Sequence, residues 1–175
     1  MHTHTTQASN SQAQLVQTRF LGSNFYGRVY AYFEVKPRNI NGGIFEGLGY
    51  LNGDQTAISI ATNSQRLFIL YFRNNPFLDT MSPASQTVPV GKWFCLEWNV
   101  RPVEGTNNHI WIDGVEVAGL VRGGTLAKEP SGTFKVDPFS EARIGWSHSA
   151  HNDPDPFTDI WFDDIAFGPE RIGCL

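Results

Sequence analysis

The chain has 175 residues, a formal net charge of −4, 41% hydrophobic and 13% aromatic residues. The negative balance and the lack of a Lys/Arg run argue against a nucleic-acid-binding surface, and no apolar run approaches the ~18 residues of a membrane span. The length suits one domain, residues 1–175. The aromatic content, together with 17 glycines and 10 prolines, favours an all-β protein with many turns.

The first residues, 1–6, carry neither a charged n-region nor an apolar stretch, so we expect no signal peptide in this sequence. His2 and His4 form an i, i+2 pair that could bind a transition metal. Terminal histidines are more often incidental.

Residues 26–36 alternate two chemistries with the two-residue period of a β-strand. One face is apolar, as on the inner side of a sheet. The other carries a cation, two tyrosines and an anion: Arg28, Tyr30, Tyr32 and Glu34. This flat amphipathic surface suits a sugar ring, which offers C–H bonds on its face and hydroxyls at its rim. The alternative is an exposed strand whose tyrosines cover the edge of the core.

Further strand-like runs recur at short intervals, separated by turn residues. The sharpest local signal is Asp113-Gly114 between two alternating runs, which predicts a tight hairpin. No segment shows a helical stripe over three turns. The pattern predicts a two-sheet antiparallel jelly roll or sandwich. The predicted strands are 13–20, 26–36, 44–51, 56–62, 66–73, 93–101, 108–113, 115–121, 132–136, 141–147 and 159–167.

The two cysteines lie far apart, with Cys95 inside a predicted strand and Cys174 next to the last residue. A disulfide between them would fasten the C-terminal strand to the sheet and indicate an exported, secreted protein. Two buried free thiols are the alternative.

Four motifs follow one another along the chain: Asn-Phe-Tyr-Gly-Arg at 24–28, Gly-Lys-Trp-Phe-Cys-Leu-Glu-Trp at 91–98, the hairpin at 110–117, and the strand 159–168 that runs into 170–174. In this order they resemble concanavalin A-like jelly-roll carbohydrate-active proteins, closest to the secreted polysaccharide-lyase-like branch that includes the fungal cellulose-induced protein. The resemblance implies a concave groove for a polysaccharide, a calcium near the final strand and, in some relatives, β-elimination of uronic-acid polymers. The chain lacks the Glu-x-Asp-x-x-Glu run of related β-glucanases and the Gln-x-His motif of alginate lyases.

Hydrolysis would need two carboxyl groups about 5–5.5 Å apart in a retaining enzyme. The strand carboxylates are Glu34, Glu46 and Glu97, of which Glu34 and Glu97 could approach each other if their strands share a sheet.

A lyase would need a neutraliser for the uronate carboxylate, a base and an acid. The catalytic candidates are Arg28 for the first role, and Tyr32 and His148 for the other two. Tyr30, Asn99, His109 and His151 could also contribute, but no spacing selects among them.

Binding without catalysis demands least of the sequence, because stacking and hydrogen bonds need no special protonation states. The expected substrate-binding residues combine the strand platform with a neighbouring strand and one tryptophan beside the His148 loop. They are Arg28, Tyr30, Tyr32, Glu34, Glu97, Asn99 and Trp146.

Asp163 and Asp164 lie inside an otherwise apolar strand, where a carboxylate needs a partner. Their oxygens suit a structural Ca²⁺, and a polar pair at a bulge is the alternative. Asn152, Asp153 and Asp155 form a weaker cluster.

These observations predict a secreted all-β jelly roll that binds a polysaccharide, with neither nucleic acid nor membrane as partner. A polysaccharide lyase is one alternative. The other is a structural or adhesion domain within a larger secreted or virion protein.

Overall fold

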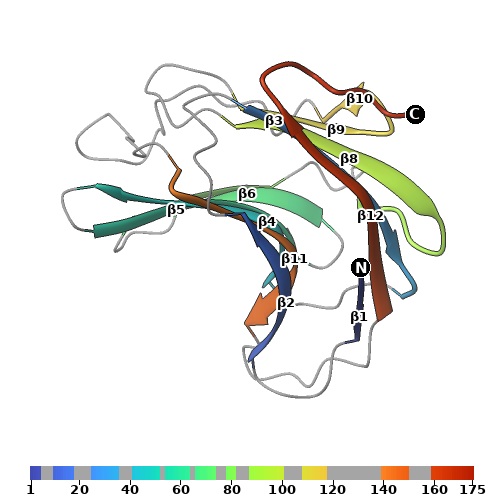
Figure 1. Ribbon diagram of the computed structural model, residues 1–175. Coiled ribbons are helices and arrows are strands. Elements are labelled where there is room, and N and C mark those ends of the chain that lie inside the picture. The colour runs from blue at the N-terminus through green and yellow to red at the C-terminus, as the bar shows by residue number, and fades with distance from the viewer. Residues whose placement is uncertain are drawn as a thin grey trace.

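The computed structural model describes residues 1–4, 10–17, 25–35, 41–51, 54–63, 66–73, 78–81, 87–100, 108–117, 139–149 and 159–175. These residues form two six-stranded antiparallel sheets that face each other (Figure 1). The predicted all-β, two-sheet fold is therefore confirmed. The strands are β1 (His2–His4), β2 (Asn10–Gln17), β3 (Phe25–Phe33), β4 (Asn41–Leu51), β5 (Asp54–Asn63), β6 (Arg66–Arg73), β7 (Leu78–Met81), β8 (Trp93–Val100), β9 (His109–Ile112), β10 (Val115–Glu116), β11 (Glu141–Ser149) and β12 (Asp159–Gly168).

Sheet A has the order β1-β12-β3-β8-β9-β10, and sheet B has the order β2-β11-β4-β5-β6-β7. Most neighbours in sheet A are distant in sequence, and the two sheets are assembled from alternating parts of the chain. The strand singled out by its alternation, β3, lies near the middle of sheet A between β12 and β8. In the part of the chain that the structure describes, no helix is long and apolar enough to cross a bilayer.

The sequence pattern missed two short strands, β1 and β7, because three or four residues of mixed polarity carry no periodic signal. The predicted hairpin is confirmed: Asp113 and Gly114 both have positive φ, 49° and 79°, as a two-residue type I′ turn requires. The predicted strand 132–136 and the end of the predicted strand 115–121 lie outside the described residues.

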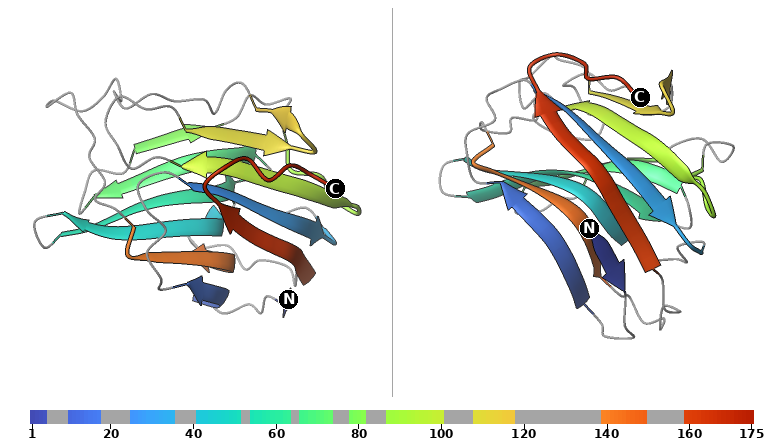
Figure 2. Two further views of the ribbon diagram at one scale, coloured as in Figure 1. Left: turned by 45° about the horizontal axis from the view of Figure 1, so that its top comes forward. Right: turned by 45° about the vertical axis from the view of Figure 1, so that its right-hand side comes forward.

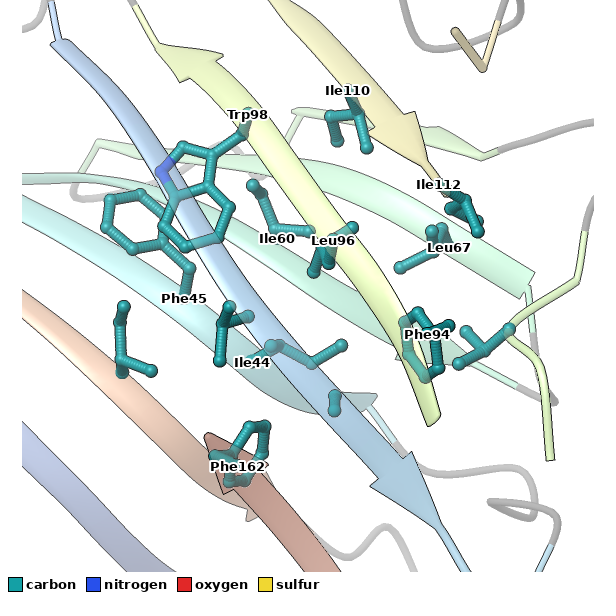
Figure 3. Packing of buried hydrophobic residues seen from close by; sticks show 14 of the residues in the cluster. Ile44, Phe45, Ile60, Leu67, Phe94, Leu96, Trp98, Ile110, Ile112 and Phe162 are labelled. Carbon is teal, nitrogen blue, oxygen red and sulfur yellow. The ribbon is translucent and has the colours of Figure 1, made fainter. Parts of the chain in front are cut away.

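The core lies between the two sheets and is built from the inward positions of each strand (Figure 3). Phe45 from sheet B and Trp98 from sheet A pack with ring centroids 4.8 Å apart. The alternation in β3 is observed directly, since Val29, Ala31 and Phe33 are buried in this core. The other side of β3 therefore faces away from sheet B.

The C-terminal segment after β12 crosses the outer side of sheet A, as the left view of Figure 2 shows. It is fastened there by the disulfide between Cys95 on β8 and Cys174, with Cα atoms 6.0 Å apart. This confirms the predicted bridge over the alternative of two free thiols.

Candidate functional site

The predicted platform on β3 faces the chain's own C-terminal segment. Arg28 donates a hydrogen bond from Nη1 to the carbonyl oxygen of Gly173 at 2.9 Å. The hydroxyl of Tyr30 accepts from the N–H of Leu175 at 2.6 Å. Arg28 is buried and Tyr30 is half-buried, so neither presents the open surface that the sequence suggested. Tyr32 lies further along the strand, where its ring contacts those of Trp161 and Trp93.

Glu97 is the main anchor of the same segment, and it is only 1% exposed. Its two carboxylate oxygens accept hydrogen bonds at 2.8 Å from the Gly173 N–H and from Nη2 of Arg171. Asn99, two residues further on, is also buried. Both were expected to contact substrate, but Glu97 binds the C-terminal segment and Asn99 is 0% exposed.

The three predicted catalytic residues do not come together. Arg28 and Tyr32 lie on sheet A, whereas His148 lies on β11 in sheet B, opposite Gly42 of β4. Glu34 follows the end of β3, six residues beyond Arg28, whose cross-strand partner is Glu97. At ~3.3 Å per residue this separates Glu34 from Glu97 by about 20 Å, too far for a glycosidase pair.

Trp146 lies in the core rather than at a ligand-facing surface. Its side chain is 1% exposed, and its ring meets that of Phe33 edge-on with centroids 5.6 Å apart. Gly42 makes this possible, because a Cβ at that position would lie 1.9 Å from the Trp146 ring. A glycan on the surface of this structure cannot reach the ring.

Asp163 and Asp164 sit at a bulge in β12, where the register with β3 shifts. Asp164 has a φ of 46°, and both residues are exposed, whereas neighbouring residues of a regular strand point to opposite faces of the sheet. The Asp164 carboxylate pairs with Arg28 at 2.8 Å, and Asp163 Oδ1 accepts the Asp164 N–H. Calcium takes six to eight oxygen ligands, and these contacts do not gather such a set. The calcium site stays a prediction, and the weaker cluster at 152–155, like His151, lies outside the described residues.

Among the described residues, one group of three histidine, cysteine or acidic side chains brings metal-type donor atoms within 4.8 Å of one another. It consists of Glu97 and the two cysteines. Their sulfurs are joined in the disulfide, so this group does not offer the thiolates that bind metals. His2 on β1 is bound to the Asp159 carboxylate at 2.6 Å.

The outer face of sheet B has a different character, because side chains that point away from the core are nevertheless buried. Phe45 packs into the core, and Gly47 faces the core ring of Phe139, so the alternate residues of β4 point outward. The outward positions of β4 and β5 nevertheless include these buried residues: Leu48, Ala57, Ser59 and Ala61. This part of the face is therefore sheltered from solvent.

Three charged side chains emerge from this sheltered face. Glu46 on β4 lies opposite Arg143 on β11 and opposite Ser59 on β5. The Arg143 guanidinium lies 3.6 Å from the Glu46 carboxylate and donates a hydrogen bond from Nε to Glu141. The side chains of the three charged residues are between 25% and 30% exposed, so a ligand on the face could touch them.

Burial raises the pKa of Glu46 above its ordinary value of 4.5. Arg143 and the hydrogen bond with Ser59 act in the opposite direction, and the negative charge of Glu141 adds to the rise. Desolvation prevails, so Glu46 holds its proton to higher pH than a free glutamate. Perturbed carboxyl groups of this kind gather at functional sites.

The sequence reasoning placed Glu46 among the strand carboxylates but did not single it out, and it missed Arg143, Glu141 and Ser59 as a group. A signal was present: Glu46 is the one charged residue in the apolar, glycine-rich segment 42–49. A lone carboxyl in such a strand requires a partner. Its partner lies about 100 residues later in the chain, which a single sequence does not reveal.

Comparison with known proteins gives fold relatives only. No family model and no curated protein matches the chain. Among solved structures, the cellulose induced protein Cip1 superimposes with a TM-score of 0.64 over 91% of this chain and 73% of its own, at 19% identity. An endo-β-1,4-glucuronan lyase from the fungus Trichoderma reesei superimposes with a TM-score of 0.71 over 97% and 80%, at 14% identity. The fold is a concanavalin A-like jelly roll.

The jelly roll is shared with proteins of other kinds. The binding domain of botulinum neurotoxin serotype D/C superimposes with a TM-score of 0.62 over 97% of this chain and 40% of its own, at 13% identity. Identities this low establish the shared jelly roll and leave the function to be argued from the residues.

Proposed function

We propose that this jelly roll binds a polysaccharide chain on the outer face of sheet B, with Glu46, Arg143 and Ser59 as its polar centre. The observation that carries the proposal is the cluster of Glu46, Arg143 and Glu141, whose side chains stay 25–30% exposed on a face where their outward-pointing neighbours are buried. Binding sites combine mostly apolar walls with a few polar groups that fix orientation. A sugar chain can engage the polar groups through its hydroxyls, which donate to carboxyl oxygens and accept from the guanidinium.

The names of the fold relatives support the same ligand class. One is a cellulose induced protein and one is a lyase of a glucuronic-acid polymer. A third is botulinum neurotoxin type C, which depends upon interaction with two ganglioside molecules to enter cells. The disulfide adds support for a secreted, extracellular location, because such bonds persist in oxidising compartments.

The charges of the site favour a neutral glycan over a uronate. Arg143 carries one positive charge and contacts two carboxyl groups, Glu141 and Glu46. The cluster is neutral when Glu46 holds its proton and negative when it does not. A uronate carboxylate would therefore meet no net positive charge.

Catalysis is the second candidate, favoured by the raised pKa of Glu46. A carboxyl group that keeps its proton could donate it to the oxygen of a glycosidic bond. Two products distinguish the chemistries: β-elimination creates an unsaturated sugar with ultraviolet absorbance, and hydrolysis creates a reducing end without it. Incubation with a panel of neutral and uronate polymers that yields neither product would leave binding as the function.

Calorimetric titration with a soluble cello-oligosaccharide tests the binding proposal. We expect Arg143→Ala to weaken binding about tenfold or more, since a hydrogen bond to a charged group contributes ~1.5–3 kcal/mol. Arg143→Lys keeps the charge but loses the planar fork, and should fall between. Glu116→Gln, an exposed acid on β10, is the matched control. Wild-type affinity in Arg143→Ala would refute the site.

A further inference from the structure

Four aromatic rings form a row across one end of sheet A, on its outer face. His2 of β1 pairs in register with Trp161 of β12, Trp161 pairs with Tyr32 of β3, and Tyr32 pairs with Trp93 of β8. The ring centroids are 4.7 Å, 5.3 Å and 5.8 Å apart along the row. Successive rings thus come from neighbouring strands, and the distances between their centroids are close to the spacing between strands in a sheet.

The row is not part of the core. Its sequence neighbours point inward: Ile160 and Phe162 beside Trp161, and Phe94 beside Trp93, are all buried. Trp93 is itself 48% exposed and is the one aromatic residue among the exposed large hydrophobic residues of the described chain. Contacts along the row stabilise the sheet. This stabilising role does not explain why Trp93, at the end of the row, remains exposed to solvent.

Polar groups border the rings. His2 is bound through Nε2 to the Asp159 carboxylate at 2.6 Å, and Glu34 and Lys92 are exposed at the ends of β3 and β8. The row therefore pairs aromatic surface with hydrogen-bonding groups at its edge, on the opposite side of the sandwich from Glu46.

We propose that this row is a second carbohydrate-binding surface, on which a linear polysaccharide lies across the strands and contacts the exposed Trp93 and the rings beside it. The class of ligand rests on the proposed function, whereas the surface itself is separate from the Glu46 site. Two sites on opposite faces would raise retention on a polymer matrix through multivalency, without a stronger contact at either site.

The dimensions of the row favour a glycan over a protein partner. A stable protein interface takes ~20–30 residues a side, and the row is one side chain wide. Beyond Tyr32 the same face is already covered, since the C-terminal segment is bound to Tyr30, Arg28 and Glu97. A narrow, linear ligand fits the strip that remains.

The other end of the same face provides a contrast. Trp111 on β9 stacks on His109 at 5.6 Å, and the guanidinium of Arg171 lies 4.4 Å from its ring centroid. Trp111 thus packs against both a cation and a second ring, whereas Trp93 is 48% exposed at the end of its row. Trp111 is therefore a matched control: the same residue type on the same face.

Retention on regenerated amorphous cellulose tests the proposal, with polyglucuronate immobilised on beads as the charged counterpart. We expect Trp93→Ala and Trp161→Ala each to lower the apparent affinity about threefold to tenfold, from ~0.5–1.5 kcal/mol per aromatic contact. Trp93→Phe should recover most of the loss, and Trp111→Ala should bind as wild type. The melting temperature of Trp93→Ala reports whether the fold is kept.

The outcomes separate the two sites. Reduced retention in both Trp93→Ala and Arg143→Ala, with a larger loss in the double variant, supports both. Wild-type retention of Trp93→Ala with loss in Arg143→Ala overturns the row alone, and the reverse overturns the Glu46 site alone. No retention of wild type on either matrix overturns both. A concentration-dependent dimer of the wild type that is lost in Trp93→Ala would show that the row contacts a second copy of the protein. That result would also overturn the row as a glycan site.

Discussion

Removing the Cys95–Cys174 disulfide should destabilise the fold by several kilocalories per mole. The bond closes a loop with a sequence separation of 79 residues. In the chain-entropy model a loop of this length restricts the unfolded chain by about 4.5 kcal/mol at 25 °C. For a protein of this size, each kilocalorie shifts the melting temperature by ~2–4 °C, which gives a drop of about 9–18 °C.

Thermal unfolding of the Cys95→Ala/Cys174→Ala double variant, followed by calorimetry, measures this drop. The wild-type protein after reduction and alkylation provides a second route to the unbridged chain. The hydrogen bonds that join the C-terminal segment to Glu97, as acceptor, and to Arg28, as donor, remain available in the double variant, so the fold should persist at room temperature. A change of less than ~2 °C would refute the reasoning, because release of the loop would then not increase the conformational entropy of the unfolded chain.

Gly27→Ala should destabilise the protein by at least ~1–3 kcal/mol in denaturant unfolding, because the added Cβ would lie 2.2 Å from the buried ring of Trp98. In the control variant Gly168→Ala the nearest atom to the added Cβ is 3.5 Å away, and an equal loss of stability there would contradict this reasoning. Glu97→Gln should cost about 1–3 kcal/mol and expose the C-terminal segment to hydrogen exchange, and unchanged protection of that segment would count against the anchoring role. For Glu46 the raised pKa means that ionisation opposes folding. Glu46→Gln should therefore gain stability relative to wild type as pH rises above the pKa of the unfolded chain, near 4.5, with no gain below it. A gain that is constant with pH would show that burial does not set the pKa of Glu46. Chelation decides the calcium prediction: a fall in melting temperature would support a bound calcium, and no change would contradict it.

The parts of the fold that the sequence predicted are those encoded by neighbouring residues. The two faces of β3 follow from its period of two, and the hairpin follows from one Asp-Gly pair. Both depend on local geometry and need no knowledge of the partner strands. The disulfide was also within reach, because only two cysteines were available.

The surroundings of the predicted site residues depend on contacts between distant parts of the chain. The sequence predicted these contacts less well. Alternation identified the outer face of β3 correctly, but it could not show that residues 171–175 return to cover Arg28 and Tyr30. Trp146, beside a polar loop, was predicted to contact ligand, yet Gly42 on the neighbouring strand leaves room for it in the core.

Irregular backbone accounts for a further difference. Simple alternation places Asp163 and Asp164 on opposite faces of a strand. The bulge in β12 removes one step of that alternation and brings Asp164 to Arg28. Bulges depend on both paired strands, so the period of one strand does not predict them.

The central claim is that a polysaccharide binds on the outer face of sheet B. Amide chemical-shift mapping during titration with a soluble cello-oligosaccharide tests it most directly, since every strand reports separately. We expect shifts concentrated at Glu46, Ser59 and Arg143 and their neighbours on β4, β5 and β11, and loss of those shifts in Arg143→Ala. Saturating binding that leaves these three strands unshifted would contradict the claim.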